Sequence, residues 1–483
     1  MTKSLSVCAC FFFICLGSVF AQKRTESHWG KTGYDIAYSA AATDDGGYIM
    51  CGLTKSDGDS IGDIVVIKTA LSGDTSWTFT LGGPKLEGGN FVMQTADGGY
   101  LVAGHCEDFG AQDCDGFLMK LDKKGNRKMF KVYGGLNDDI FEGAVEMPDG
   151  SFVFAGITAS YGNPDNSQRR HTWFVKTSST GDLIWSKFYA WSGHEYGYSI
   201  ASMTNGGYLA VGYKSQVPVF NGYRNGGYDG QIMRLNENGD MLWTRLYHKE
   251  GVTIFYKILP SQDNGFYLAG FTTLTVQGPT SGLLVKLDAD GNELWEKLYG
   301  DEHNSIIFND IKQLPNGNLM FAGSSTEVDS PGDVYILTTD ANGNKINDEL
   351  CGGSNSSGSS VAVQGNNGYL VAGISSKYGD PNGDIYYIIK DNTVLNVPST
   401  EVVLPHIFPN PVKDRSAIVL PAPESYSTVD MDVRDMSGKL IYSLKNVMAK
   451  DIVINKGSLP PAEYLYRIMC KDGKEYKGKF VVE

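Results

Sequence analysis

Aromatic, arginine and histidine side chains gather in three stretches that follow one another within residues 158–229. The side chains that could contact a ligand are Arg169, Arg170, His171, Trp191, His194, Tyr196, Tyr223, Arg224 and Tyr228. Aromatic rings stack on sugars and cations, while arginine and histidine form directional hydrogen bonds. These residue types favour recognition of a carbohydrate or a peptide. The alternative is that long loops use the same residues to pack against themselves.

The sequence contains few of the catalytic motifs that are recognised by a fixed spacing of residues. It contains no His-Glu-x-x-His motif and no phosphate-binding loop. Most carboxylates stand beside glycine, as at residues 57–59 and 288–291, where local Asx turns explain them; calcium in residues 57–63 is the alternative. We therefore predict no metal and no cofactor. An acid–base pair contributed by separate loops stays open, because its spacing is set in three dimensions.

A repeated pattern must position these side chains. A turn, an apolar run and a closing glycine recur seven times. The closing glycines are Gly52, Gly104, Gly156, Gly212, Gly270, Gly323 and Gly373, at intervals of 50 to 58 residues. A period of this length indicates a propeller or a solenoid.

Each repeat also contains a second hairpin, seen most clearly around Gly291 and Trp295. Asp-Gly and Asn-Gly at the turns supply the positive φ that tight hairpins need. The sixth repeat divides into strands over residues 305–313, 319–322, 334–338 and 345–350. Four antiparallel strands per repeat are typical of a propeller blade. We predict an all-β, seven-bladed β-propeller over residues 22–391.

The seventh repeat lacks its fourth strand. Residues 28–36 resemble residues 132–140, where a fourth strand leads into the next repeat. We therefore expect residues 23–30 to form the outer strand of the last blade and to close the ring, which leaves no free sheet edge there.

The two faces of such a disc differ in their connections. Turns between the first and second and between the third and fourth strands are short, whereas the other loops vary in length. Variable loops on a rigid scaffold concentrate binding residues, and all the candidate ligand residues lie on that side. We call the two sides the turn face and the loop face.

The N-terminus has the features of an export signal. Lys3 is followed by the apolar residues 7–20 and a small-residue cleavage site at Ala21. We predict that residues 1–21 are a signal peptide; a membrane anchor is the alternative, but the apolar stretch is short for a span. The net charge of −14 and the lack of a basic block argue against nucleic-acid binding.

Cysteine usage suggests neither a disulfide framework nor a zinc site. Removal of the signal peptide leaves Cys51, Cys106, Cys114, Cys351 and Cys470, an odd number without Cys-x-x-Cys spacing. Cys106 and Cys114 could bridge one loop, and that pairing stays open. Cys51 stands where other repeats have Ala or Val, which favours buried packing.

A different pattern follows a linker at residues 392–405. It runs from Phe408-Pro409-Asn410-Pro411 through an Asp-x-x-Gly-Lys segment at residues 435–439 to a Lys-Phe-Val-Val ending at residues 479–482. The composition predicts a small β-sandwich of the immunoglobulin-like kind over residues 406–483.

These segments resemble, in order, the type A sorting domain of the type IX secretion system of Bacteroidetes. The resemblance implies that this domain engages the type IX secretion machinery. The protein would then be released, or attached to the outer-membrane surface, with no transmembrane span in the mature chain. The alternative is a separate immunoglobulin-like binding module.

The Gly-x-x-x-Trp segments resemble the tryptophan-docking repeats of quinoprotein dehydrogenases, in which the tryptophan packs between blades. That shared feature is architectural, because this chain has seven repeats and no adjacent cysteine pair. The sequence therefore favours a secreted or surface-attached module that binds a glycan, a peptide or an envelope protein. The alternative function is a secreted polysaccharide hydrolase or lyase that uses carboxylates on the loop face.

Overall fold

The structure is a computed structural model. It describes residues 23–56, 61–110, 113–163, 169–191, 193–215, 227–249, 251–273, 278–301, 303–327, 332–353, 355–366, 368–377, 380–391, 406–408, 410–420, 428–471 and 475–483. All regular elements in these ranges are β-strands, and the chain divides into two compact units, residues 1–394 and 395–483.

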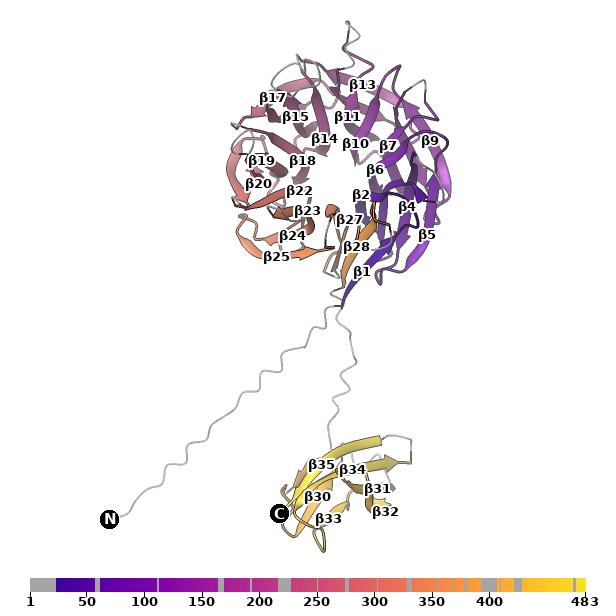
Figure 1. The fold of residues 1–483 in the computed structure, drawn as a ribbon, viewed down its shortest axis with the longest axis vertical. Helices are drawn as coiled ribbons and strands as arrows, with labels where there is room; N and C mark the ends of the chain where they lie inside the picture. The colour runs from indigo at the N-terminus through magenta and orange to yellow at the C-terminus, as the bar shows by residue number, and fades with distance from the viewer. Residues whose placement is uncertain are drawn as a thin grey trace, which may run out of the picture. The chain divides into compact units, whose positions relative to one another are not determined.

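The first unit is a ring of seven four-stranded antiparallel sheets, which confirms the predicted seven-bladed propeller (Figure 1). The innermost strands are β2 (Asp35–Ala42), β6 (Glu87–Gln94), β10 (Asp139–Glu146), β14 (Glu195–Ser202), β18 (Thr253–Pro260), β22 (Asn304–Gln313) and β26 (Ser356–Val363). The second strands are β3 (Tyr48–Thr54), β7 (Tyr100–Cys106), β11 (Phe152–Thr158), β15 (Tyr208–Ser215), β19 (Phe266–Thr273), β23 (Leu319–Glu327) and β27 (Gly368–Ser375).

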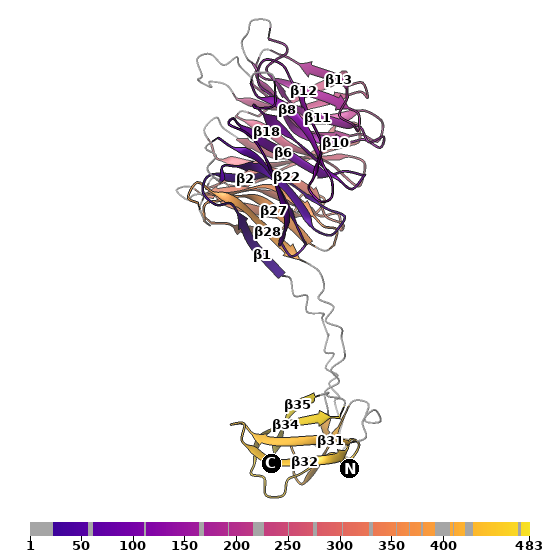
Figure 2. The ribbon, with the colours of Figure 1, turned by 90° about the vertical axis from the view of Figure 1, so that its right-hand side faces the viewer.

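The third strands are β4 (Asp63–Thr69), β8 (Asp115–Leu121), β12 (His171–Thr177), β16 (Tyr228–Leu235), β20 (Thr280–Leu287), β24 (Asp333–Thr339) and β28 (Asp384–Asp391). The outer strands are β5 (Thr75–Leu81), β9 (Arg127–Tyr133), β13 (Leu183–Tyr189), β17 (Met241–Tyr247), β21 (Glu293–Tyr299), β25 (Lys345–Cys351) and, in the last blade, β1 (Lys23–Trp29). Figure 2 shows the blades of this unit from the side.

The ring closes through the N-terminal strand. β1 pairs antiparallel with β28 along its whole length, from Lys23 opposite Asp391 to Trp29 opposite Ile385. The hydroxyl group of Tyr386 also donates a hydrogen bond of 2.7 Å to the Glu26 carboxylate. The last blade is thus built from both ends of the propeller sequence.

Glycines at the hairpin turns fix the blade geometry. At Gly291, for example, φ is 79°, and its N–H donates to the Asp288 carbonyl group at 3.1 Å. The N–H of Asp288 in turn donates to the Asn292 carbonyl group at 2.8 Å, which completes a tight turn. Only glycine adopts this left-handed conformation without strain.

The same glycine receives a tryptophan from the neighbouring blade. A Cβ atom on Gly291 would lie 2.9 Å from the Trp243 indole ring. Trp77, Trp185 and Trp295 approach Gly125, Gly239 and Gly343 in the same way. The Gly-x-x-x-Trp pattern therefore joins adjacent blades at their outer strands.

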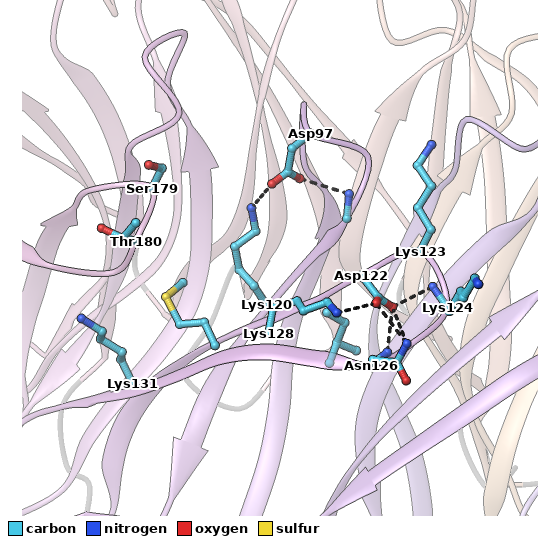
Figure 3. A pocket seen from close by; sticks show the side chains of 13 residues that line it. Asp97, Lys120, Asp122, Lys123, Lys124, Asn126, Lys128, Lys131, Ser179 and Thr180 are labelled. Atoms are coloured by element: carbon cyan, nitrogen blue, oxygen red, sulfur yellow. Dashed lines mark hydrogen bonds and ion pairs between the residues drawn. The ribbon is translucent and has the colours of Figure 1, made fainter.

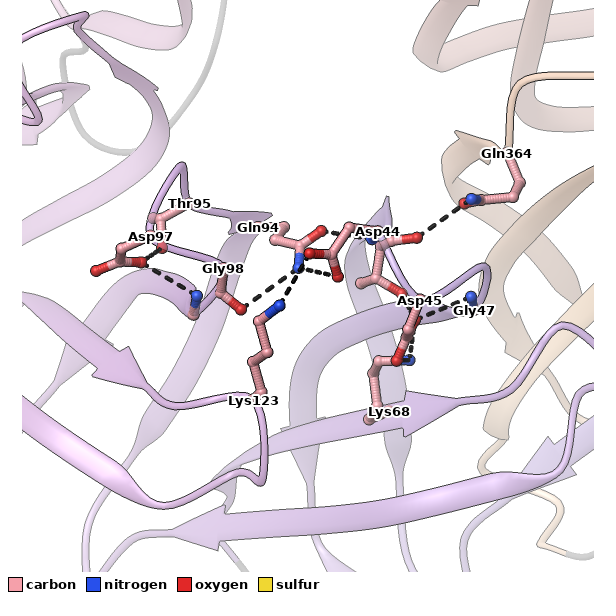
Figure 4. Close-up of polar contacts among 12 residues, drawn as sticks. Asp44, Asp45, Gly47, Lys68, Gln94, Thr95, Asp97, Gly98, Lys123 and Gln364 are labelled. Atoms are coloured by element: carbon pink, nitrogen blue, oxygen red, sulfur yellow. Dashed lines mark hydrogen bonds and ion pairs between the residues drawn. The ribbon is translucent and has the colours of Figure 1, made fainter.

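Hydrogen bonds between blades also hold the turn face together (Figure 4). The Gln94 amide group donates to the Asp44 carboxylate at 2.8 Å and accepts from the Asp44 N–H at 2.7 Å. Lys123 pairs with Asp44 at 3.0 Å, and Gln364 donates to the Thr43 carbonyl group at 3.2 Å. These contacts link the turns of three consecutive blades.

The second unit is a small β-sandwich with its own core. One sheet contains β29 (His406–Phe408), β30 (Arg415–Val419) and β33 (Val453–Asn455). The other contains β31 (Thr428–Asp435), β32 (Leu440–Met448), β34 (Ala462–Cys470) and β35 (Glu475–Val482). Val433, Ile454, Ile468 and Phe480 are fully buried between them.

Candidate functional site

A β-bulge interrupts the innermost strand of every blade at the same level. The unpaired residues at the bulges are Tyr38, Asn90, Glu142, Tyr198, Tyr256, Asn309 and Ser359. We call these seven residues the bulge ring. Each is half-buried, whereas the residues on both sides of it are buried, except Phe91 and Lys257, which are half-buried and also line the channel. The bulges thus turn one side chain per blade toward the central channel.

All seven residues of the bulge ring line one cavity of about 460 Å³ in the loop-face half of the channel. We call it the channel cavity. A second hollow of about 420 Å³ lies in the turn-face half. Ser39, Phe91 and Lys257 line both, so these side chains separate the two. The Lys257 ammonium group lies 5.5 Å from the centre of the Phe91 ring, across the channel.

The floor of the channel cavity contains a cluster of one carboxylate and two ammonium groups. The Asp310 carboxylate lies 3.7 Å from both the Lys257 and the Lys312 ammonium groups and is 2% exposed. It accepts hydrogen bonds from the Ser360 hydroxyl group at 2.7 Å and from two backbone N–H groups. Burial disfavours ionisation of Asp310, but these partners outweigh it and lower the pKa of the carboxyl group.

Glu142 is in a different electrostatic environment. Removal from water raises the pKa of its carboxyl group to about 7, and the charge of Arg170 offsets only part of this effect. Nearby His105 also lines the channel cavity, and burial lowers the pKa of its ring to about 4. At neutral pH the His105 ring is therefore uncharged, while Glu142 is poised between its two protonation states.

Tyrosine rings in mutual contact, some stacked and some edge-to-face, connect the channel cavity with the loop face. The cluster consists of Tyr196, Tyr198, Tyr213, Tyr228 and Tyr256, which we call the tyrosine cluster. Ring centres are 4.7 Å apart for Tyr196 and Tyr213, 4.7 Å for Tyr213 and Tyr228, and 4.9 Å for Tyr198 and Tyr256. Tyr198 and Tyr213, at 5.9 Å, join the two halves. Two of the residues predicted from sequence, Tyr196 and Tyr228, belong to this cluster.

Arg170 extends the tyrosine cluster into the loop that precedes β12. Its guanidinium group donates to the Tyr196 hydroxyl group at 2.5 Å and to the Asp138 carboxylate at 2.9 Å. The same group lies 5.8 Å from the centre of the Tyr196 ring. The Arg170 N–H donates to Nδ1 of His194 at 3.2 Å, and burial lowers the pKa of that ring. Arg170, His194, Tyr196 and Tyr228 are thus brought together.

The other predicted residues take different places. His171 is 1% exposed, and its ring nitrogens contact Glu195 at 2.8 Å and Asn163 at 3.0 Å, so it serves the packing of the blade junction. Trp191 packs against Tyr189 and lies 5.2 Å from the Lys214 ammonium group. The backbone carbonyl group of Arg169 accepts a hydrogen bond from Asn163. Tyr223 and Arg224 lie outside the described residues.

The bulge ring was not foreseen among the candidate ligand residues, although the sequence contains a signal for it. Each bulge residue stands ten positions before the first residue of the apolar run in its repeat, as Tyr38 does before Tyr48 and Glu142 before Phe152. The mixed chemistry at this position hides the regularity, because tyrosine, asparagine, glutamate and serine share no hydropathy pattern.

A larger hollow, of about 910 Å³, lies between the turns of the second and third blades (Figure 3). Lysines dominate its lining: Lys120, Lys123, Lys124, Lys128 and Lys131. Lys120 pairs with Asp97, Lys128 with Asp122 at 2.9 Å, and Lys131 with Asp182 at 2.7 Å. Lys123 pairs with Asp44 as well, so four of these five ammonium groups already have an acidic partner. We therefore regard the smaller channel cavity as the better candidate site.

Within the described residues, no group of three or more His, Cys, Asp or Glu side chains could hold a metal ion. Residues 57–60 of the possible calcium loop lie outside the described ranges. Cys106 and Cys114 are both free and buried in this structure. Burial raises the pKa of the Cys106 thiol to about 12, which disfavours the reactive thiolate.

Residues 406–483 match the family described as "Secretion system C-terminal sorting domain". This match confirms the sorting domain of the type IX secretion system predicted from the sequence. A comparison with curated proteins finds no match. Among the described residues, the structure contains no helix with the length and apolar character of a membrane span.

Several solved structures are similar to the chain at low identity. The WD40 domain of Pan2 from Neurospora crassa covers 73% of this chain and 88% of its own, with 9% identity and a TM-score of 0.45. The β-propeller domain of the Trilobed protease from Pyrococcus furiosus covers 77% and 99%, with 11% identity and a TM-score of 0.44. A Dyadobacter fermentans protein described as of unknown function covers 76% and 97%, with 11% identity and a TM-score of 0.43.

Proposed function

We propose that this protein, exported through its sorting domain, is a binding module that recognises a glycan on the loop face of the propeller. The observation that supports this most directly is the tyrosine cluster, which runs without interruption from Arg170 to the channel cavity. Sugar rings stack on aromatic faces, and their hydroxyl groups pair with planar polar groups such as guanidinium and amide.

The bulge ring adds polar groups to these aromatic surfaces. The amide groups of Asn90 and Asn309 donate to the carbonyl groups of Phe141 and Gly358 in the following blades, at 3.1 and 2.9 Å. These bonds fix the orientation of both side chains before any ligand arrives. A preorganised site loses less entropy on binding, which favours affinity.

The hydrolase alternative requires two carboxyl groups that act on one bond. Glu142 and Asp310 both line the channel cavity, and their pKa values shift in opposite directions. Asp310, however, is almost fully buried and already accepts three hydrogen bonds. This arrangement favours a structural role for Asp310, and therefore a binding function for the cavity.

A glycan array probed with the mature chain, together with a polysaccharide-degradation assay, tests the proposal. We expect binding to at least one glycan without turnover. Arg170→Ala with Tyr196→Ala should weaken that binding, whereas Lys124→Ala on the turn face should not. Turnover of a polysaccharide without binding to any array glycan would overturn the proposal. Peptide or envelope-protein binding at the same residues would keep the site but replace the ligand class.

A further inference from the structure

Glu142 is an ionisable group of the channel cavity whose partner is missing. Within the described part of the chain, no hydrogen bond or ion pair reaches its carboxyl group. A half-buried carboxylate without a partner costs free energy, so a ligand that supplies a positive charge would recover it.

Three tyrosines of the bulge ring share the channel cavity with this carboxyl group. Tyr38, Tyr198 and Tyr256 line the same cavity, and the charge of Glu142 acts on all three phenol groups. Burial, followed by neighbouring tyrosines and then by the charge of Glu142, raises the pKa of Tyr38 and Tyr198, so both phenols stay neutral. Neutral aromatic rings present negative faces to a cation, and an aromatic cage with one carboxylate suits an organic ammonium ion.

The remaining charges around the channel cavity do not fill this role. Lys257 faces the cavity from β18, but it pairs with Asp310 of β22. Arg170 is held by Asp138 and Tyr196. His105, on β7, is neutral because burial lowers the pKa of its ring. Lys312 also lies 3.7 Å from the Asp310 carboxylate and lines the turn-face hollow, not the channel cavity. Among the described residues, Glu142 is therefore the acidic group of the channel cavity that no cation contacts directly.

We propose that the channel cavity binds a primary ammonium group, and that the loop face thereby selects glycans with unacetylated amino sugars. This inference rests on the proposed glycan-binding function and specifies its ligand. The ammonium group would donate to the Glu142 carboxylate and lie against the rings of Tyr38, Tyr198 and Tyr256. The sugar ring that bears it would extend toward the tyrosine cluster.

Two tetrasaccharides that differ only in acetylation provide the test. Calorimetry with the mature chain should give at least about tenfold tighter binding for the glucosamine tetramer than for the N-acetylglucosamine tetramer, the ratio expected for one added ion pair with cation–π contacts. Glu142→Gln should abolish this preference, and Tyr38→Leu should reduce it. Glu293→Gln, at an exposed glutamate on β21, is the matched control and should leave it unchanged.

Proton release gives a second readout that a merely structural role would not produce. Near pH 6 the ammonium group of a lysine-containing peptide carries a full charge, whereas Glu142, with a pKa raised to about 7, is mostly protonated. Binding of the cation should expel that proton. Calorimetry in two buffers of different ionisation enthalpy should detect release by the native chain and none by Glu142→Gln.

The outcomes separate this inference from the proposed function. Equal binding of both tetrasaccharides, unaffected by Glu142→Gln, would overturn the ammonium site and leave glycan recognition standing. A lysine-containing peptide that binds through Glu142 when neither tetrasaccharide does would overturn the amino-sugar ligand. Failure of all three probes to bind would overturn the ammonium site.

Discussion

Asp115 of the second blade and Asp139 of the third both place a carboxyl oxygen next to the position that a side chain on Gly134 would take. A Cβ atom on that glycine would clash with both groups. Both aspartates are almost fully buried. Asp35 and Asp384 flank Gly30 in the same way where the last blade meets the first. Burial, aided by the charge of the neighbouring acid, raises the pKa of Asp139 and of Asp384.

These acid pairs predict a dependence of stability on pH. Burial, opposed by hydrogen bonds and aided by the charge of Asp115, raises the pKa of Asp139 to about 6. The folded state therefore binds more protons than the unfolded state between roughly pH 4 and pH 6, so stability falls as pH rises through this window. For Asp139 the loss by neutral pH is about 2–3 kcal/mol in the free energy of unfolding.

Asp139→Asn should therefore stabilise the propeller at pH 7 and have a smaller effect near pH 4, as measured by urea unfolding at both values. The new amide group can donate to Asp115 and still accept from the Gly135 N–H, as Asp139 does at 2.7 Å. Asp113→Asn, at an exposed site, is the control. Equal effects at the two pH values would contradict the raised pKa of Asp139.

Gly291→Ala should destabilise the propeller by about 2–4 kcal/mol, because it combines a strained φ with a collision against the Trp243 ring. Gly46 separates the two causes. Its φ is 87°, but nothing lies within 4 Å of the position that a Cβ atom would take there, so Gly46→Ala should cost only about 1 kcal/mol. Denaturant unfolding of both variants measures the difference, and equal costs would argue against tryptophan docking as a source of stability.

Removal of residues 23–29 should lower the melting temperature sharply and promote aggregation. The deletion leaves β28, with the buried Tyr387 and Ile389, as an unprotected sheet edge. A chain that begins at Lys23 is the control and should melt like the mature protein. Unchanged melting of the shorter chain would mean that the ring holds without its closing strand.

Residues 406–483 should be sufficient for export across the outer membrane in a host with a type IX secretion system. They form a separate compact unit with its own core, which favours folding outside the propeller. A periplasmic reporter fused to this segment should become accessible to protease on intact cells. The same fusion without residues 475–483, which include β35, should remain protected, since the sheet loses an edge strand.

The architecture could be predicted from the sequence because every blade repeats the same turns and strand patterns. The turn glycines, the apolar second strand and the Gly-x-x-x-Trp hairpin are all visible as a pattern. The strands expected in the sixth repeat agree closely with β22–β25, although β23 continues to Glu327 beyond the expected residue 322. That extension pairs Glu327 with Asn304, a long-range partner that the local sequence does not specify.

The candidate site was harder to foresee. Arg170 and Tyr196 attract attention as residue types, and the structure places them together. His171 is also a residue type that often binds ligands, but both of its ring nitrogens form hydrogen bonds within the protein, to Glu195 and Asn163. The residue type of Glu142 does not identify it as a channel residue. It faces the channel only because the inner strand contains an extra residue at this position. A bulge depends on pairing with the neighbouring strand, which the residue type alone does not reveal.

The bulges also assign blade packing and the lining of the channel to different residues of the inner strands. Most of the flanking positions on the inner strands are buried and are constrained by packing, whereas the extra residue of each strand lines the channel. Seven positions can therefore change independently while the scaffold stays the same. Each blade thus contributes one channel-lining side chain, and a substitution at a single bulge position is expected to change the ligand specificity of the channel while the blades keep their packing.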